Sequence, residues 1–544
     1  MGAIRSSGHK REAPSGDNTP PGHVRDDTRT TSEVGPTPLR RQHIQDFRFR
    51  NFKENQLATA TESTKMAPEI LKSSATLMSK IGKETGIHAI VSSCRDTKIL
   101  CLQRFVRLFA YGASFLILAH FLSGLGFSEE QTGLFMTLTL LGDVVISFLL
   151  TTITDQIGRR LVLALGAFSM TMSGLAFYTS ENYWVLLFAS VLGVISPSGN
   201  EIGPFRAVEE SILAHLTAKE ERSDIFAWYT LFGTAGAALG AVSCGWMVQL
   251  LEARDSWTLH DAQRAVFLMY AALGGLKLLL NYFLSRSVEL ETRYQTLPGE
   301  VDEEEELEGL TEAGEPNHQS PPTAPSDPSP GLTVLQRVRN LFPYISPASR
   351  SILLRLVFLF AIDSFASGIA SPSWLTYFFT TVHSLQPSTL GTLFLVSNIL
   401  GSLSNLVALP VARRIGPLKT MVFGHLPSTV FLALIPIPPA GIQFGSWLSM
   451  AFLALRACTQ SIDQAPRQAF LAAAVLPGER TAVLGVVNIV KTFSQAGGIG
   501  SMGVLAGKKM WVVALVGAGV MKASYDLLLL WMFLGVKDRE GGVN

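Results

Sequence analysis

Residues 151–160, Thr-Thr-Ile-Thr-Asp-Gln-Ile-Gly-Arg-Arg, form a short charged stretch between two long apolar runs. One run precedes it over about 130–153, and the other follows it over about 161–178. A helix crosses a bilayer with roughly 20 apolar residues, so both runs are long enough to span a membrane. The charged stretch is therefore expected at a membrane face, and Arg159 and Arg160 indicate that this face is cytoplasmic.

The composition of the chain agrees with a membrane protein. Of the 544 residues, 47% are hydrophobic and only 16% are charged, with a mean hydropathy of +0.29. The net charge of +1 gives no basic face, which argues against a partner of the nucleic-acid class. The four cysteines have no pairing or metal-ligand spacing, so we expect reduced, structural thiols.

Twelve apolar runs are long enough to cross a membrane as helices. They cover about 105–125, 131–153, 161–180, 184–212, 226–250, 265–284, 352–380, 389–411, 418–437, 444–474, 482–506 and 511–535. Lysine and arginine gather in the loops on one side of these runs, although Lys508 and Lys509 lie on the other. The sequence therefore predicts an all-α integral membrane protein with twelve transmembrane helices and both termini in the cytoplasm.

Polar segments divide the chain. We predict a mostly disordered cytoplasmic tail at 1–100, a six-helix half at 101–285, a cytoplasmic linker at 286–350, a second six-helix half at 351–536 and a short cytoplasmic tail at 537–544. The N-terminal residues are too polar to bury a core of their own. The linker is acidic at 303–306 and rich in Pro and Ser at 316–330, a composition typical of solvated linkers.

The two halves repeat one another. Gly133 and Gly158 bracket the second span, and Gly391 and Gly416 bracket the eighth span at the same separation. A Glu-Arg pair precedes both the fifth and the eleventh span. Such a repeat predicts two parallel, pseudo-symmetric six-helix halves with a solute site near the membrane midplane between them.

The Asp-x-x-Gly-Arg motif at 155–159 resembles the loop between the second and third helices of major facilitator superfamily transporters. The resemblance extends over about 430 residues and leaves the subfamily open. It implies alternating access, in which the two halves rock around a central site, and a usually monomeric protein. It also implies that the motif forms a gate that locks the cytoplasmic helix ends together in one conformation. The gate residues are Asp155, Gly158, Arg159 and Arg160.

One departure and one alternative bear on this gate. Thr151 stands where the family motif usually opens with glycine. The arginines could instead simply anchor the loop at lipid phosphates, but anchoring does not require the Asp-x-x-Gly-Arg spacing, which favours the gate.

The fifth span carries four glycines, at 233, 236, 240 and 245. They resemble the glycine-rich fifth-helix motif of drug–proton antiporters, although Ala241 replaces its proline and Cys244 one of its glycines. Small residues at this spacing also serve close helix packing, so both interpretations stay open.

The fourth span combines helix breakers with charges. Two prolines and two glycines lie within 197–204 and predict a broken helix, which is tolerated at membrane depth only around a cavity. Asn200, Glu201 and Arg206 would line that cavity. Glu209 and Glu210 both lie close enough along the helix to pair with Arg206. The alternative is an internal salt bridge that only holds the helices together.

Other spans also contain ionisable residues, which usually face a cavity or a partner. They are Asp143 in the second span, Asp363 in the seventh, Asp463 and Arg467 on one face of the tenth, and Lys491 in the eleventh. A buried carboxylate is a candidate proton carrier, because desolvation disfavours its charged form. In the twelfth span, Lys522 and Asp526 have the spacing of a structural ion pair.

No enzyme class is indicated, since the sequence lacks a phosphate-binding loop, a nucleophile elbow and metal-ligand histidine spacing. No cofactor or metal is expected. The sequence favours a secondary transporter that exports a small anionic or zwitterionic organic solute in exchange for protons. Glu201 or Asp363 would carry the proton, and Arg206, Arg467 or Lys491 would bind the solute. Proton-coupled nutrient uptake and a non-transporting membrane sensor are the alternatives. The plasma membrane and the vacuolar membrane are equally open as locations.

Overall fold

The computed structural model describes residues 86–193, 195–197, 204–218, 220–289, 346–475 and 479–533. Within these ranges the regular secondary structure is entirely helical. The predicted terminal tails and the linker lie mostly outside the described residues, so the predicted domain boundaries remain predictions.

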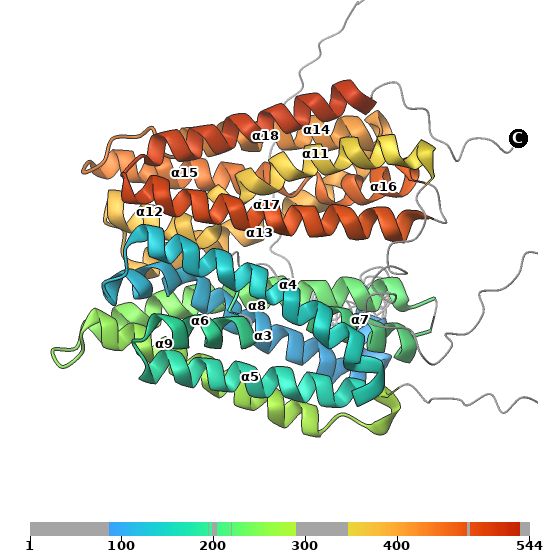
Figure 1. Ribbon diagram of the computed structural model, residues 1–544, viewed down its shortest axis with the longest axis horizontal. Coiled ribbons are helices and arrows are strands. Elements are labelled where there is room, and N and C mark those ends of the chain that lie inside the picture. The colour runs from blue at the N-terminus through green and yellow to red at the C-terminus, as the bar shows by residue number, and fades with distance from the viewer. Residues whose placement is uncertain are drawn as a thin grey trace, which may run out of the picture. The chain divides into compact units, whose positions relative to one another are not determined.

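The helices fall into two groups. The first comprises α2 (Ile87–Ser92), α3 (Arg95–Gly124), α4 (Glu129–Ile157), α5 (Arg159–Thr179), α6 (Tyr183–Leu192), α7 (Pro204–Leu216), α8 (Arg222–Glu252), α9 (Leu259–Tyr282) and the short 3₁₀ helix η1 (Arg286–Val288). The second comprises α11 (Pro347–Ile369), α12 (Pro372–His383), α13 (Pro387–Ile415), α14 (Pro417–Leu434), α15 (Gln443–Gln460), α16 (Gln464–Ala474), α17 (Arg480–Gly507) and α18 (Trp511–Phe533). Within each group the axes of the long helices lie roughly parallel to one another (Figure 1).

Each predicted span coincides with one helix or with two consecutive helices. Among the described residues, eight segments meet length and hydropathy criteria for crossing a membrane, and the remaining spans are shorter or less apolar. The predicted all-helical membrane fold is therefore confirmed.

Three spans are broken. The fourth divides into α6 and α7, as the glycines and prolines of that span predict. The seventh divides into α11 and α12 just before Pro372, which lacks the N–H that a continuous helix would require. The tenth divides into α15 and α16 around residues 461–463. For the last two spans the sequence predicted only the limits, 352–380 and 444–474, and no break.

Two glycines mark the repeat in the backbone. Gly158 joins α4 to α5 with φ 97°, and Gly416 joins α13 to α14 with φ 87°. Residues other than glycine rarely adopt a positive φ of this size, so glycine is required at both turns. The internal repeat predicted around these glycines is thus visible in the local geometry.

The glycines of the fifth span permit close packing of α8 on α3. A Cβ atom on Gly240 would lie 1.9 Å from the carbonyl oxygen of Phe109, and one on Gly236 would lie 2.5 Å from that of Phe105. Gly112 on α3 meets the carbonyl oxygen of Ala237 at 2.1 Å in the same way. This confirms the close-packing interpretation of the motif.

The two groups touch mainly through α4 with α17, α8 with α13 and α3 with α12. We call the end of the helices that holds residues 125–128 the far side, and the end that holds residues 285–289 the tail side. The hydroxyl of Thr137 donates to the carbonyl of Ala496 at 2.9 Å, and a Cβ atom on Gly391 would lie 2.6 Å from the carbonyl oxygen of Ala241. These contacts all lie in the far-side halves of their helices.

Candidate functional site

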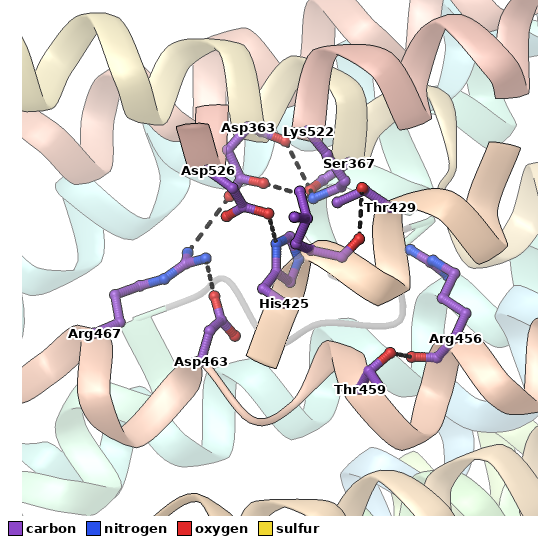
Figure 2. Close-up of polar contacts among 11 residues, drawn as sticks. Asp363, Ser367, His425, Thr429, Arg456, Thr459, Asp463, Arg467, Lys522 and Asp526 are labelled. Carbon is purple, nitrogen blue, oxygen red and sulfur yellow. Dashed lines mark hydrogen bonds and ion pairs between the residues drawn. The ribbon is translucent and has the colours of Figure 1, made fainter. Parts of the chain in front are cut away.

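A buried carboxylate forms the centre of a charged cluster in the second group. Asp363 on α11 is 4% exposed. Its Oδ1 accepts a hydrogen bond from Nζ of Lys522 at 2.6 Å, and its Oδ2 accepts one from Nη1 of Arg467 at 3.4 Å. Lys522 also donates to Oγ of Ser367 at 2.8 Å (Figure 2). One carboxylate therefore neutralises cations from two other helices, α16 and α18.

The tenth span supplies the second carboxylate of this cluster. Asp463 lies directly before α16 and forms an ion pair with Arg467 one turn later. The prediction that these two residues share a helix face is confirmed. The Arg467 guanidinium also lies over the rings of Phe360 and Tyr525, at 5.3 and 5.8 Å from their centroids. Two carboxylates and two aromatic rings thus hold Arg467 in place.

The twelfth span is paired differently from the prediction. Lys522 binds Asp363 on α11, and Asp526 contacts His425 on α14 through Oδ2 and Nδ1 at 2.9 Å. Asp526 and His425 are both almost fully buried. The predicted ion pair between Lys522 and Asp526 is therefore wrong, because each finds a closer partner on a neighbouring helix. His425 was missed, since a single histidine in an apolar run gives no spacing signal.

Two further cations lie in this region. Arg456 near the end of α15 is buried and lies within electrostatic reach of Asp363. Lys491 on α17 lies 5.4 Å from the centroid of the Phe360 ring. Neither forms an ion pair with any residue in the described ranges. The cations of the cluster are thus Arg456, Arg467, Lys491 and Lys522, and the carboxylates are Asp363, Asp463 and Asp526.

The first group contains a second buried cluster, centred on Glu209 of α7. Its carboxylate accepts two hydrogen bonds from Arg107 on α3, at 2.6 and 2.7 Å. It also accepts one from the hydroxyl of Tyr229 on α8 at 2.6 Å. Nζ of Lys277 on α9 lies 3.5 Å from the same carboxylate. Four helices are thereby tied together.

Of the two glutamates predicted to lie within reach of Arg206, Glu210 pairs with it as expected, and the prediction is wrong for Glu209. Arg206 lies on an exposed face of α7 and pairs with Glu210 at 2.7 Å. Glu209 is fully buried and faces Arg107 instead. Helix spacing allows Arg206 to pair with Glu209 or with Glu210, and the rotation of α7 about its axis turns Glu209 toward α3. Arg107 was overlooked because it lies near the start of the first span, where a basic residue is expected to flank the membrane.

The two clusters are related by the internal repeat. Glu209 and Arg467 are separated by the same interval as Gly158 and Gly416, so they occupy equivalent positions with opposite charge. In both groups this residue pairs with the first long helix, through Arg107 on α3 or Asp363 on α11. A lysine on the last helix completes each cluster.

Of the three remaining predicted site residues, the structure describes one. Asn200 and Glu201 lie outside the described residues. Asp143 is buried on α4. Among the residues that the structure describes, no group of His, Cys, Asp and Glu side chains is arranged to hold a metal ion.

The predicted gate loop is tied to the segment that follows α9 and η1. The Glu289 carboxylate accepts the backbone N–H of Arg159 at 2.7 Å and that of Arg160 at 2.9 Å, which caps the start of α5. Nη2 of Arg159 donates to Oγ of Ser211 on α7 at 2.8 Å. The side chain of Asp155 lies outside the described residues. Glu289 was missed because it lies inside the predicted linker, near its start, and shows no pattern with the loop.

Comparison with known proteins identifies the family. The model of the Major Facilitator Superfamily matches residues 100–362. The uncharacterized membrane protein YJR124C of Saccharomyces cerevisiae is 36% identical over 445 residues, which cover 81% of this chain and 95% of the yeast protein. This chain belongs to the major facilitator superfamily. It is therefore a multi-pass membrane protein of a secondary transporter family, with the twelve-helix fold of that family.

More distant proteins agree with the fold. The D-xylose-proton symporter aligns with a TM-score of 0.58 at 15% identity, over 82% of this chain and 99% of the symporter. The nucleoside transporter NupG aligns with a TM-score of 0.51 at 13% identity, over 81% of this chain and 98% of NupG. Quinolone resistance protein NorA of Staphylococcus aureus is 22% identical over 186 residues, which cover 34% of this chain and 44% of NorA.

Proposed function

We propose that this superfamily member transports a small organic anion together with a proton, using the charged cluster around Asp363. The observation that carries the proposal is the pair of cations Arg456 and Lys491, which form no ion pair with a described residue. Arg456 is buried and Lys491 is partly exposed, and a cation at membrane depth is costly unless an anion accompanies it. A carboxylate or phosphate group on the solute would supply that anion at the centre of the membrane.

Asp363 is the proposed proton carrier. While charged, it neutralises Lys522 and Arg467 at 2.6 and 3.4 Å. When it takes up a proton, both cations lose that partner and become available to the solute. Proton and anion therefore favour each other's binding, which is the thermodynamic condition for moving both in the same direction.

Alternating access supplies the route. The described contacts between the helix groups lie on the far side, which supports a state that is closed there. If the tail side faces the cytoplasm, as the distribution of Lys and Arg predicts, this state would exchange solute with the cytoplasm. Asp155 and Arg159 would then form the gate that closes the tail side in the opposite state.

Export, which the sequence analysis favoured, is the second candidate. It requires that proton and solute compete, as they would for a zwitterion whose ammonium group binds Asp363 in place of the proton. The similarity to Quinolone resistance protein NorA over 186 residues supports this direction.

The test compares cells that express wild type, Arg456→Gln or no transporter. Organic anions would be measured by mass spectrometry inside and outside the cells, at two external pH values. We expect an anion that accumulates inside only with wild type, and more strongly at the lower external pH. Arg264→Gln is the matched control, since Arg264 pairs with Glu181 at the far side, away from the cluster.

Each other outcome has a defined meaning. An anion depleted inside only with wild type would support export and reject uptake. An Arg456→Gln variant that matches wild type would remove Arg456 from the site. If wild type also matches cells without transporter, the non-transporting sensor becomes the better hypothesis.

A further inference from the structure

A cavity, separate from both charged clusters, lies on the far side between the two helix groups. Its volume is about 500 Å³, within the range of sites for drug-sized molecules. Helices α3, α8 and α9 of the first group line it together with the α12–α13 connection of the second. Most of its wall is apolar, as at Leu116 and Leu390.

Three polar side chains in the wall retain unused hydrogen-bonding capacity. Gln263 is 4% exposed and forms no hydrogen bond with a described residue. Nε2 of His120 is buried without a partner among those residues. Gln249 donates to Gln386 at 2.8 Å, but its Oε1 has no partner in the described chain. Buried polar groups normally find partners, so these groups point to a ligand that supplies them.

The charge of the wall determines the class of ligand. Glu252 is the charged side chain among the described lining residues, and neither Lys nor Arg contributes to the wall. An apolar wall with amide and imidazole groups and one carboxylate suits a lipophilic cation. We propose that this cavity binds a lipophilic organic cation of drug size. The same ligand would be repelled from the cluster around Asp363, where cations exceed carboxylates.

Such a ligand would act on transport without entering the central site. It contacts both helix groups while the far side is closed, so it stabilises that state over the state in which the far side opens. The consequence is inhibition that a higher solute concentration does not overcome. This consequence rests on alternating access and is independent of which solute is transported.

Binding can be measured with the full-length protein in lipid nanodiscs. The probes are rhodamine 6G, a fluorescent lipophilic cation, and Nile red, a neutral fluorescent dye, and each is followed by fluorescence polarisation against empty nanodiscs. We expect saturable binding of rhodamine 6G to wild type. Leu390→Trp, which fills the cavity, should weaken it at least tenfold. Glu252→Gln should weaken it about twofold to fivefold, because Glu252 is exposed. Glu252→Gln should leave Nile red unaffected.

Matched variants keep the test decisive. Glu130→Gln removes an exposed far-side carboxylate outside the cavity and should leave rhodamine 6G binding unchanged. If Leu390→Trp melts at a lower temperature than wild type, Gln263→Leu replaces it, because leucine keeps the volume and removes the amide. The proposal is overturned if rhodamine 6G binds no better than to empty nanodiscs. It is equally overturned if the cavity variants bind like wild type, or if Arg456→Gln alone changes the affinity.

Discussion

Replacing Asp363 by asparagine tests the proposed proton carrier. The side chain keeps its shape and one oxygen near Lys522, but it can no longer take up a proton. One carboxylate carries one proton in each cycle, and a tenfold concentration ratio corresponds to about 1.4 kcal/mol. A gradient of one pH unit can therefore drive about tenfold accumulation of a monovalent anion in wild type. In Asp363→Asn we expect no accumulation, so that the anion concentrations inside and outside become equal.

The assay uses proteoliposomes with an imposed pH gradient and the anion identified in the cell experiment. Exchange of labelled for unlabelled anion across the same membrane serves as the internal control, because exchange needs binding and rocking but no proton gradient. We expect Asp363→Asn to retain exchange and to lose accumulation. Losing a partner within a buried ion pair costs about 3–5 kcal/mol, so the melting temperature should be recorded alongside. Accumulation equal to wild type would refute Asp363 as the proton carrier.

Three further predictions concern the scaffold. Glu209→Gln should lower the free energy of unfolding by about 3–5 kcal/mol, because it leaves buried cations unpaired. Arg206→Gln on the exposed face should change the free energy of unfolding by no more than about 0.5 kcal/mol. Equal melting temperatures of the two variants would contradict the assigned roles. Gly240→Ala should destabilise the protein by about 1–3 kcal/mol, since its Cβ would meet a carbonyl oxygen of α3 at 1.9 Å, and Gly275→Ala, with open space around it, is the control. Glu289→Gln should cost about 1 kcal/mol by weakening the cap on α5, measured by thermal unfolding, and an unchanged midpoint would show that the cap contributes nothing.

The helices could be predicted from the sequence because their cause is local. Long apolar runs give membrane spans, and the prolines and glycines of the fourth span give its division into α6 and α7. Positive φ at Gly158 and Gly416 follows from the repeat around them. Each of these features depends only on neighbouring residues and on the bilayer.

The charge partners could not be predicted in the same way. Glu209 was expected to pair with Arg206 and instead binds Arg107, which lies about a hundred residues earlier. His425 and Lys277 gave no signal, since their partners lie on other helices. Such pairings depend on how each helix is rotated in the bundle, and a single sequence contains no direct record of that rotation.

The most direct measurement of the central claim follows protons while the anion moves. Proteoliposomes would be loaded with a pH-sensitive dye, and the identified anion would be added outside with no initial pH gradient. Coupled movement in one direction predicts acidification of the interior by wild type and none by Asp363→Asn. Alkalinisation of the interior, or anion entry with no pH change, would contradict the proposed co-transport.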